Sequence, residues 1–203
     1  MTSFLQHTWR RMRFGEPIVV VSGLPRSGTS MTMKMLEAAG IPLVQDGIRT
    51  ADEDNPKGYF ELERVKDLDK DADKKWLHEA RGKAVKIISF LLPNLPDDNN
   101  YKIIFMIRNI EEVLASQAKM LDRRGEDSDT SDERMTDLYA GHLAQTKRLI
   151  RMSPHFHVME LKYRDALNDA RAQAERINEF LGRPLDVEKM VSVVDERLYR
   201  NRR

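Results

Sequence analysis

Residues 18–30 read IVVVSGLPRSGTS, an unbroken apolar run that ends in a short loop bounded by two glycines. Such a run is typical of a central parallel strand that is covered on both faces. Apolar residues at helical spacing begin at Met31 and predict a helix directly after the loop. A strand, a Gly-rich loop and a helix N-terminus in this order direct several backbone N–H groups at one point. The stretch therefore predicts a binding site for an anion.

The loop has the glycine spacing of a phosphate-binding P-loop but departs from it at the cation. Thr29 stands where the P-loop has lysine, and the positive charge comes earlier, as Arg26. A P-loop hydrolase of ATP or GTP needs that lysine, and it needs Mg²⁺ held partly by an acidic residue at a strand end. The strand most like the acidic partner, 103–107, ends here in Arg108. These residues predict that arginine and backbone amides bind an anionic group without a metal ion.

Length and composition limit the class of protein and its partners. Residues 1–203 suffice for one domain, and neither a repeat nor a change in composition marks a boundary. The formal charge of +1 argues against a strongly basic nucleic-acid-binding protein. The absence of cysteine excludes disulfides and a cysteine nucleophile, and no apolar stretch approaches the roughly 18–20 residues that span a bilayer. We expect a cytoplasmic protein without a nucleic-acid partner or a membrane span, and we find no sequence signal for its oligomeric state.

Apolar runs alternate with amphipathic segments along the chain. The runs predict strands at 18–22, 41–45, 84–92, 101–107 and 156–161. Helical spacing predicts a helix from the loop to residue 39 and another directly after Arg108. It also predicts helices at 135–152, 167–181 and 186–194, and one or two exposed helices at 61–80. The alternation predicts a three-layer α/β fold like that of the P-loop nucleotide hydrolases. We expect a parallel sheet of about five strands with helices on both faces.

Three further segments have no strong periodicity. Residues 1–14 predict an N-terminal helix or arm, which either packs on the domain or lies on a membrane surface. Residues 46–61 form a long polar loop near the phosphate site, a location where loops are often functional. Residues 122–134 are rich in Asp, Ser and Arg and predict a mobile loop, which is either a solvated surface loop or a lid over the substrate.

Two motifs, in this order, resemble those of the sulfotransferases. Residues 25–30, PRSGTS, resemble the family's 5′-phosphosulfate loop, most closely the version found in tyrosylprotein sulfotransferases and many bacterial members. Residues 104–109, IFMIRN, with Ser116 eight residues after Arg108, resemble the family's 3′-phosphate motif. Less specific matches are the Lys-bearing segment 84–86, the turn YRDAL at 163–167, where the family has Tyr-Glu-Asp-Leu, and the segment NPKGYFE at 55–61.

The resemblance implies binding of 3′-phosphoadenosine 5′-phosphosulfate (PAPS) and in-line, metal-independent transfer of its sulfuryl group. The acceptor would be a hydroxyl or amine on a small molecule, a carbohydrate or a peptide. By the same resemblance Arg26 lies on the leaving phosphate and the sulfuryl oxygens, and Arg108 and Ser116 lie on the 3′-phosphate. The remaining cofactor-binding residues would be Ser27, Gly28, Thr29 and Ser30 of the loop, and Tyr163 beside the adenine.

The chain departs from the family pattern at the general base. Cytosolic sulfotransferases have a histidine just after the second-strand lysine, whereas here Lys86 is followed by Ile87-Ile88-Ser89. Other branches use a glutamate, and Glu61 is the best candidate, with Asp54 as second choice. The alternative for Glu61 is a carboxylate that stabilises the start of a helix. Met31 also replaces the aromatic residue that often stacks on adenine.

Three hypotheses about function therefore stay open at this point. The first is a PAPS-dependent sulfotransferase with Arg26 and Glu61 as catalytic residues. The second is a non-catalytic module that binds PAPS or its desulfated product PAP but lacks a general base. The third is a metal-dependent nucleotide kinase or NTPase, which Thr29 in the lysine position argues against.

Overall fold

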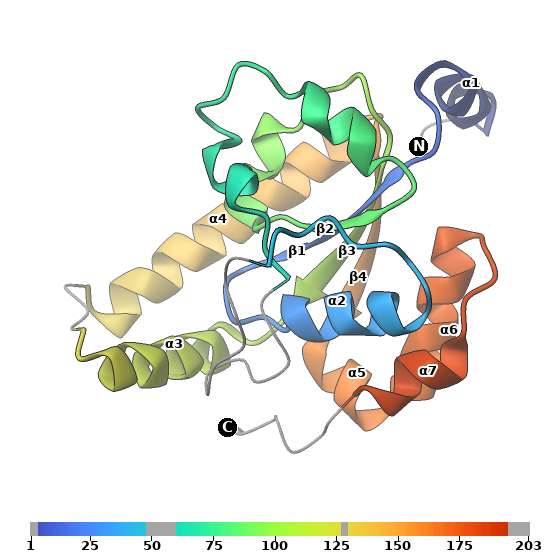
Figure 1. The fold of residues 1–203 in the computed structure, drawn as a ribbon. Helices are drawn as coiled ribbons and strands as arrows, with labels where there is room; N and C mark the ends of the chain where they lie inside the picture. Colours follow the sequence, from blue (N-terminus) through green and yellow to red (C-terminus); the bar gives the residue numbers. More distant parts are fainter. Residues whose placement is uncertain (1–3, 48–59, 127–129, 195–203) are drawn as a thin grey trace.

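A four-stranded parallel sheet forms the centre of the molecule. The computed structural model describes residues 4–47, 60–126 and 130–194, and the structural statements below concern these ranges. The strand order is β2-β1-β3-β4 (Figure 1). The strands are β1 (Ile18–Gly23), β2 (Ala84–Lys86), β3 (Tyr101–Ile107) and β4 (Phe156–Lys162). All neighbouring strands run parallel, and β1 is buried along its whole length, so the predicted α/β class is confirmed.

Helices cover both faces of the sheet (Figure 1). Val19 and Val21 of β1 point to one core cluster, and Ile18 and Val20 point to the other, as the period-2 geometry of a strand requires. The first face is covered by α2 (Thr29–Ala38), α5 (Tyr163–Asn168), α6 (Ala170–Leu181) and α7 (Val187–Ser192). The second face is covered by α4 (Asp132–Met152) and the 3-10 helices η1 (Glu63–Asp67), η2 (Lys75–Ala80) and η3 (Ser89–Asn94). α3 (Ile110–Arg124) follows β3 and packs with α4.

Two predicted strands differ from the structure. The run at 84–92 is a strand only as far as Lys86, and η3 begins at Ser89. Ile88 and Phe90 are exposed, and Pro93, which has no N–H for a strand ladder, lies inside η3. In place of a strand at 41–45, Leu43 forms one isolated bridge to Ala84. The described sheet therefore has four strands, where about five were expected.

The two ends of the predicted loop at 122–134 are helical. α3 continues to Arg124, and α4 begins at Asp132 behind the N-cap Ser131, whose Oγ accepts from the amide of Arg134. Residues 127–129 lie outside the described residues, as do residues 48–59 of the predicted loop at 46–61. The segment 61–80 forms two short 3-10 helices, the second of the two expected alternatives.

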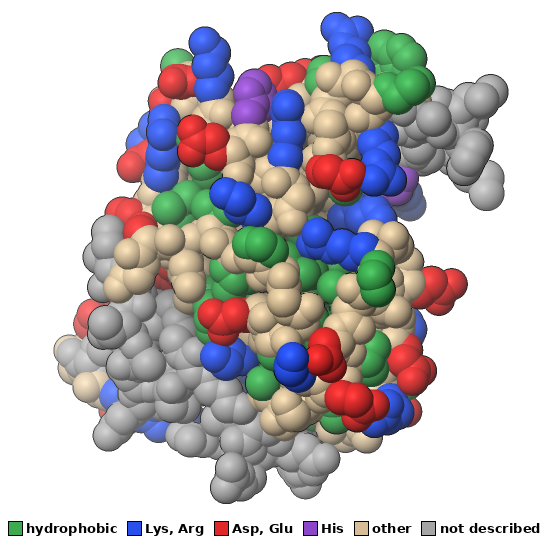
Figure 2. All heavy atoms as spheres, turned by 45° about the vertical axis from the view of Figure 1, so that its right-hand side comes forward, with side chains coloured by type: hydrophobic (Ala, Val, Ile, Leu, Met, Phe, Trp, Pro, Cys, Tyr) green, Lys and Arg blue, Asp and Glu red, His purple; other side chains and the backbone are tan. Residues whose placement is uncertain are grey.

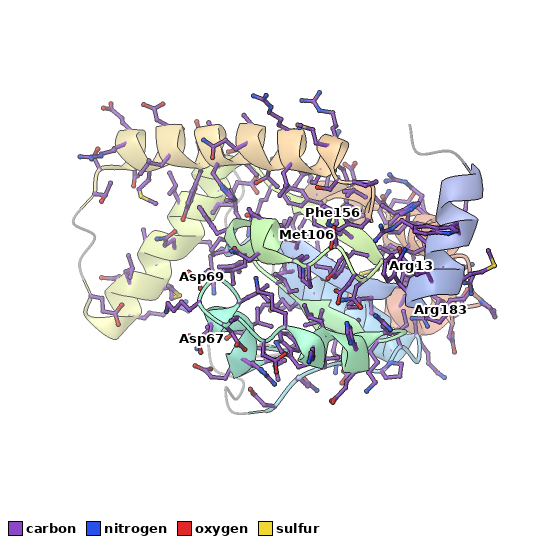
Figure 3. All side chains as sticks on the ribbon, turned by 90° about the horizontal axis from the view of Figure 1, so that it is seen from above. Arg13, Asp67, Asp69, Met106, Phe156 and Arg183 are labelled. Atoms are coloured by element: carbon purple, nitrogen blue, oxygen red, sulfur yellow. The ribbon has the colours of Figure 1, made fainter. Side chains whose placement is uncertain are left out.

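α1 (Phe4–Phe14) occupies the segment for which an N-terminal helix or arm is predicted. Arg10 fixes it to the body, because its Nε donates to Oδ1 of Asn100 at 2.9 Å and its Nη2 donates to the carbonyl oxygen of Asn99 at 2.9 Å. Figure 3 shows α4 along one side of the molecule and α1, with Arg13, at one end.

Charged side chains of both signs lie on the surface. The face shown in Figure 2 has acidic and basic side chains interspersed, as the formal charge of +1 leads one to expect. Among the described helices, none combines the length and the apolar character that a bilayer-spanning helix requires.

Candidate functional site

The loop between β1 and α2 has two residues in the left-handed region of backbone conformation. Gly28 has a φ of 102°, and a Cβ added there would lie 2.4 Å from Cδ2 of Tyr163. Only glycine therefore lets the loop lie directly on that ring. Arg26 has a φ of 66°, which is uncommon for a residue with a side chain. The loop conformation is specified by its sequence and carries backbone strain at the arginine.

The N-terminus of α2 begins at Thr29, directly after the loop. Its N-cap is Gly28, which has no side chain, and no side-chain cap hydrogen bond is formed there. The first N–H groups of a helix have no intrahelical partners, and the helix dipole favours a negative charge beside them. This end of α2 is thus suited to an anion, as the sequence predicts.

Arg26 contacts the first turns of α3. Its Nε donates to Oγ of Ser116 at 3.0 Å. The structure thereby brings together two of the residues predicted to bind the cofactor, although the sequence analysis placed Ser116 with Arg108 and not with Arg26. A guanidinium beside a hydroxyl provides several donors for one anionic group.

Arg108 reaches the same loop from the end of β3. Its side chain is 7% exposed, and its Nη1 donates to the carbonyl oxygen of Arg26 at 2.9 Å. Its guanidinium carbon lies 4.4 Å from the ring centroid of Tyr163. The two arginines predicted at the ends of neighbouring strands therefore lie side by side, and the ring of Tyr163 contacts both Arg108 and the position of Gly28.

Glu112 and Arg164 join this network, and the sequence analysis missed both. The Glu112 side chain is 3% exposed and accepts from Arg108 Nε at 3.1 Å and from Arg164 Nη2 at 2.9 Å. A buried carboxylate is stable only when it is paired. The four-residue spacing between Arg108 and Glu112 is typical of an ion pair and could have been recognised in the sequence. Nothing in the local sequence links either residue to Arg164.

A second polar cluster lies on the other side of the loop. Lys86, at the end of β2, has its Nζ 3.1 Å from Oε1 of Glu61 and 3.4 Å from Oγ of Ser30. Glu61 thus lies beside the start of α2 and precedes η1, which begins at Glu63. It pairs with Lys86, and it lies just before Leu62, the N-cap residue of η1. Asp54 lies outside the described residues.

Three of the predicted cofactor-binding side chains are buried under or within the loop. Ser27 Oγ has no partner among the described residues, and a Cβ on Gly23 would lie 2.6 Å from it, so its side chain fills the space beneath the loop. Thr29 and Tyr163 are also buried. Within the described ranges, His, Asp and Glu side chains form no group of three or more that suits a metal ion.

The chain matches the family model for the sulfotransferase domain over residues 16–203. It belongs to the sulfotransferase family. The match leaves only the first 15 residues outside, and α1 accounts for most of them. A comparison of this sulfotransferase family member with curated protein sequences found no match.

Solved structures of sulfotransferases have a similar fold. The mouse sulfotransferase SULT7A1 complexed with PAP superposes with a TM-score of 0.55 at 15% identity, over 91% of this chain and 63% of that protein. The sulfotransferase domain of the Synechococcus PCC 7002 olefin synthase gives 0.51 at 15% identity, over 91% and 79%. A sulfotransferase from Alicyclobacillus acidocaldarius gives 0.50 at 16% identity, over 85% of each chain. At these identities the likeness establishes the shared fold.

Proposed function

We propose that this sulfotransferase family member moves a sulfuryl group from PAPS to a hydroxyl or amine acceptor. The observation that carries the proposal is the pair of polar clusters at the uncapped N-terminus of α2. Arg26 and Ser116 lie on one side of the loop, and Lys86 and Glu61 lie on the other. The arrangement combines cations for an anionic donor with a carboxylate that can accept a proton.

The donor groups at the loop fit a ligand with two anionic ends. Arg26, Lys86, Ser30 and the first amides of α2 would hold the 5′-phosphosulfate, with Ser27, Gly28 and Thr29 contributing through their backbone. Arg108 and Ser116 would hold the 3′-phosphate. A place for adenine beside Tyr163 stays a prediction, because the ring itself lies buried against the loop.

The chemistry assigned to the chain's own residues is charge stabilisation and proton transfer. PAPS, when bound, supplies the sulfuryl group, and PAP is the product. Arg26 and Lys86 would stabilise the negative charge that develops on the oxygens of the leaving phosphate and the sulfuryl group. Glu61 would accept the proton of the acceptor hydroxyl or amine on a carboxylate oxygen, and its contact with Lys86 keeps that carboxylate beside the loop.

Calorimetric titration with PAP in the presence of EDTA tests this function. We expect binding that does not need a divalent metal and that weakens in Arg26→Ala. Failure of the wild-type chain to bind PAP at millimolar concentration would overturn the proposal. Mg²⁺-dependent turnover of ATP would favour the kinase or NTPase hypothesis in its place.

Glu61→Gln separates an enzyme from a binding module. We expect the rate of sulfuryl transfer to fall by about 10²–10⁴-fold, the usual contribution of a general base, while PAP affinity stays unchanged. The assay follows radiolabelled sulfuryl from PAPS to a panel of alcohols, phenols, sugars and amines, and to water when no acceptor is present. The matched control is Glu63→Gln, because Glu63 is exposed, pairs with Lys66, and lies two residues away.

A wild-type chain that binds PAP and transfers nothing, to acceptor or to water, would identify the non-catalytic module. Glu61 would likewise lose its assigned role if Glu61→Gln transferred at the wild-type rate. One sulfotransferase-like unit over residues 1–203, a cytoplasmic location, and a small-molecule, carbohydrate or peptide acceptor stay predictions of the sequence.

A further inference from the structure

We infer that Arg164 is a positioning residue that offsets the charge of Glu112, so that Arg108 keeps a net positive charge for the 3′-phosphate of the nucleotide. The inference rests on the proposed function, because it needs a nucleotide at Arg108. Arg164 lies outside both the PRSGTS loop and the 3′-phosphate motif.

Glu112 joins Arg108 and Arg164 through its two carboxylate oxygens. One carboxylate oxygen, Oε2, accepts from Arg108 Nε, and the other, Oε1, accepts from Arg164 Nη2. The carboxylate is almost completely buried, so water does little to screen its charge. Glu112 therefore acts strongly on the electrostatic potential at Arg108.

The charges of Arg108, Glu112 and Arg164 do not cancel. Arg108 and Glu112 alone form a neutral pair, and a neutral pair attracts a phosphate weakly. With Arg164 two cations share one carboxylate, and the cluster has a net charge of +1. The guanidinium of Arg108 has five N–H donors, of which the contacts to Glu112 and to the carbonyl of Arg26 are two.

Arg164 lies at the surface beside the buried carboxylate of Glu112. It is 56% exposed and follows Tyr163 at the start of α5, so it approaches Glu112 from the solvent side while Arg108 approaches from within the fold. The turn that contains it resembles the family's Tyr-Glu-Asp-Leu turn, in which the same position is acidic. A glutamate here would place two carboxylates together and would leave Arg108 as their nearest partner. This chain has the opposite charge at that position.

The test compares two nucleotides that differ in one group. Dissociation constants are measured by calorimetry for PAP and for adenosine 5′-monophosphate, which lacks the 3′-phosphate. We expect Arg164→Ala to weaken PAP binding by about tenfold and 5′-monophosphate binding by less than about twofold, because the lost charge acts at the 3′-phosphate. Arg171→Ala is the matched control, since Arg171 is 53% exposed and also pairs with a glutamate, Glu188.

A double-mutant cycle then separates a positioning role from direct contact with the ligand. In a Glu112→Gln background, Arg164→Ala should change PAP affinity by less than about twofold, because without the carboxylate Arg164 is no longer held beside Arg108. A tenfold loss that persists in this background would mean that Arg164 binds the ligand itself, and the inference would be wrong. An equal loss for both nucleotides would show a structural role and would also overturn it.

A charge series at position 164 covers the case in which Glu112→Gln fails to fold. Arg164→Lys should bind PAP within about threefold of wild type, and Arg164→Glu should bind it more weakly than Arg164→Ala. Equal affinity of the Ala and Glu variants would overturn the inference. If wild-type protein binds neither nucleotide, the proposed function itself fails, which is distinct from PAP binding that is insensitive to Arg164.

Discussion

The carboxyl ends of the parallel strands form one edge of the sheet, and their amino ends form the opposite edge. Both edges have Arg and Lys side chains, but the partners of these side chains differ. At the carboxyl edge, where the strands end, Arg26 contacts a serine hydroxyl and Lys86 contacts a serine hydroxyl and a glutamate. At the opposite edge, Arg10 donates to the backbone carbonyls of residues 97 and 99, and Lys102 donates to those of residues 180 and 181. Most partners at the carboxyl edge are side chains, although Arg108 also donates to the carbonyl oxygen of Arg26. Most partners at the opposite edge are backbone carbonyls, although Arg10 also donates to the side chain of Asn100.

The partners explain why one edge is a candidate site and the other is structural. The carbonyls that Lys102 contacts are the last ones of α6, so this ammonium caps a helix C-terminus. Burial lowers the pKa of Lys102, as do the neighbouring charges of Arg11 and Arg183. Cations at the carboxyl edge instead lie beside a helix N-terminus, where the oxygens of an anion can replace the hydroxyl oxygens. Substitutions at each edge should therefore have different effects.

Gly28→Ala should have the largest effect. The added Cβ would lie 2.4 Å from Tyr163 at a φ of +102°, so steric overlap and backbone strain add together. We expect the free energy of unfolding, measured by urea denaturation, to fall by about 3 kcal/mol and PAP binding to be lost. In Gly40→Ala the φ is +86° and no atom lies within 4 Å, so the loss should be only about 1 kcal/mol.

Gly141→Ala completes this series, because Gly141 lies in α4 with neither a positive φ nor a neighbour within 4 Å. Alanine there should raise the free energy of unfolding by up to about 1 kcal/mol and leave PAP binding unchanged. A Gly28→Ala variant as stable as wild type would show that the loop does not depend on its close approach to Tyr163.

Arg26→Ala and Arg10→Ala should separate ligand binding from stability. Arg26→Ala should weaken PAP binding by about 10–100-fold, the value of one charged hydrogen bond, and change the free energy of unfolding by less than about 0.5 kcal/mol. Arg10→Ala loses three hydrogen bonds and should lower the free energy of unfolding by about 2 kcal/mol without changing PAP affinity. Calorimetry and urea denaturation measure the two quantities. Weakened PAP binding in Arg10→Ala would contradict the division between the two edges.

Acid should destabilise the protein through two partly buried histidines. Burial lowers the pKa of His142, which bonds Ser89 beneath the carboxyl side, and of His155, which precedes β4 at the opposite edge. Below pH of about 6.5 the unfolded chain therefore binds more protons than the folded one, and the free energy of unfolding falls with pH. Each histidine contributes at most about 1.4 kcal/mol per pH unit.

His142→Gln tests this pH effect. At pH 8 the difference in free energy of unfolding between wild type and variant reports lost packing and hydrogen bonding. At pH 5.5 the difference should be smaller, because only the wild type loses stability by protonation at this site. A difference that stays constant from pH 8 to pH 5.5 would rule out the titration of His142.

Most of the fold could be predicted because its strands are mostly apolar in the sequence. The runs at 18–22, 101–107 and 156–161 contain few polar residues and are followed by helical spacing, and each is a strand in the structure. The run at 84–92 has the same composition, yet Ile88 and Phe90 are exposed there. Apolar composition alone does not separate a buried strand from a turn with exposed apolar residues.

The candidate site could be predicted in position but not in its pairings. Arg26 and Arg108 were expected to converge because both follow parallel strands, and they do. That Ser116 would contact Arg26 depends on how α3 is rotated against the loop, which the sequence does not encode locally. Arg164 meets Glu112 only because β4 pairs with β3, so its role is visible only in three dimensions.

The left-handed backbone of Arg26 has an evolutionary consequence. Arginine at a φ of 66° costs on the order of 1 kcal/mol, and glycine adopts this conformation without that cost. Under selection for thermal stability alone, Arg26→Gly would be a favoured mutation, and it would remove the guanidinium from the loop. Lineages that evolve with their ligand should therefore keep the less stable residue, whereas lineages released from ligand binding should drift to the more stable one. A laboratory evolution experiment with and without selection for PAP binding would reveal which residue position 26 acquires.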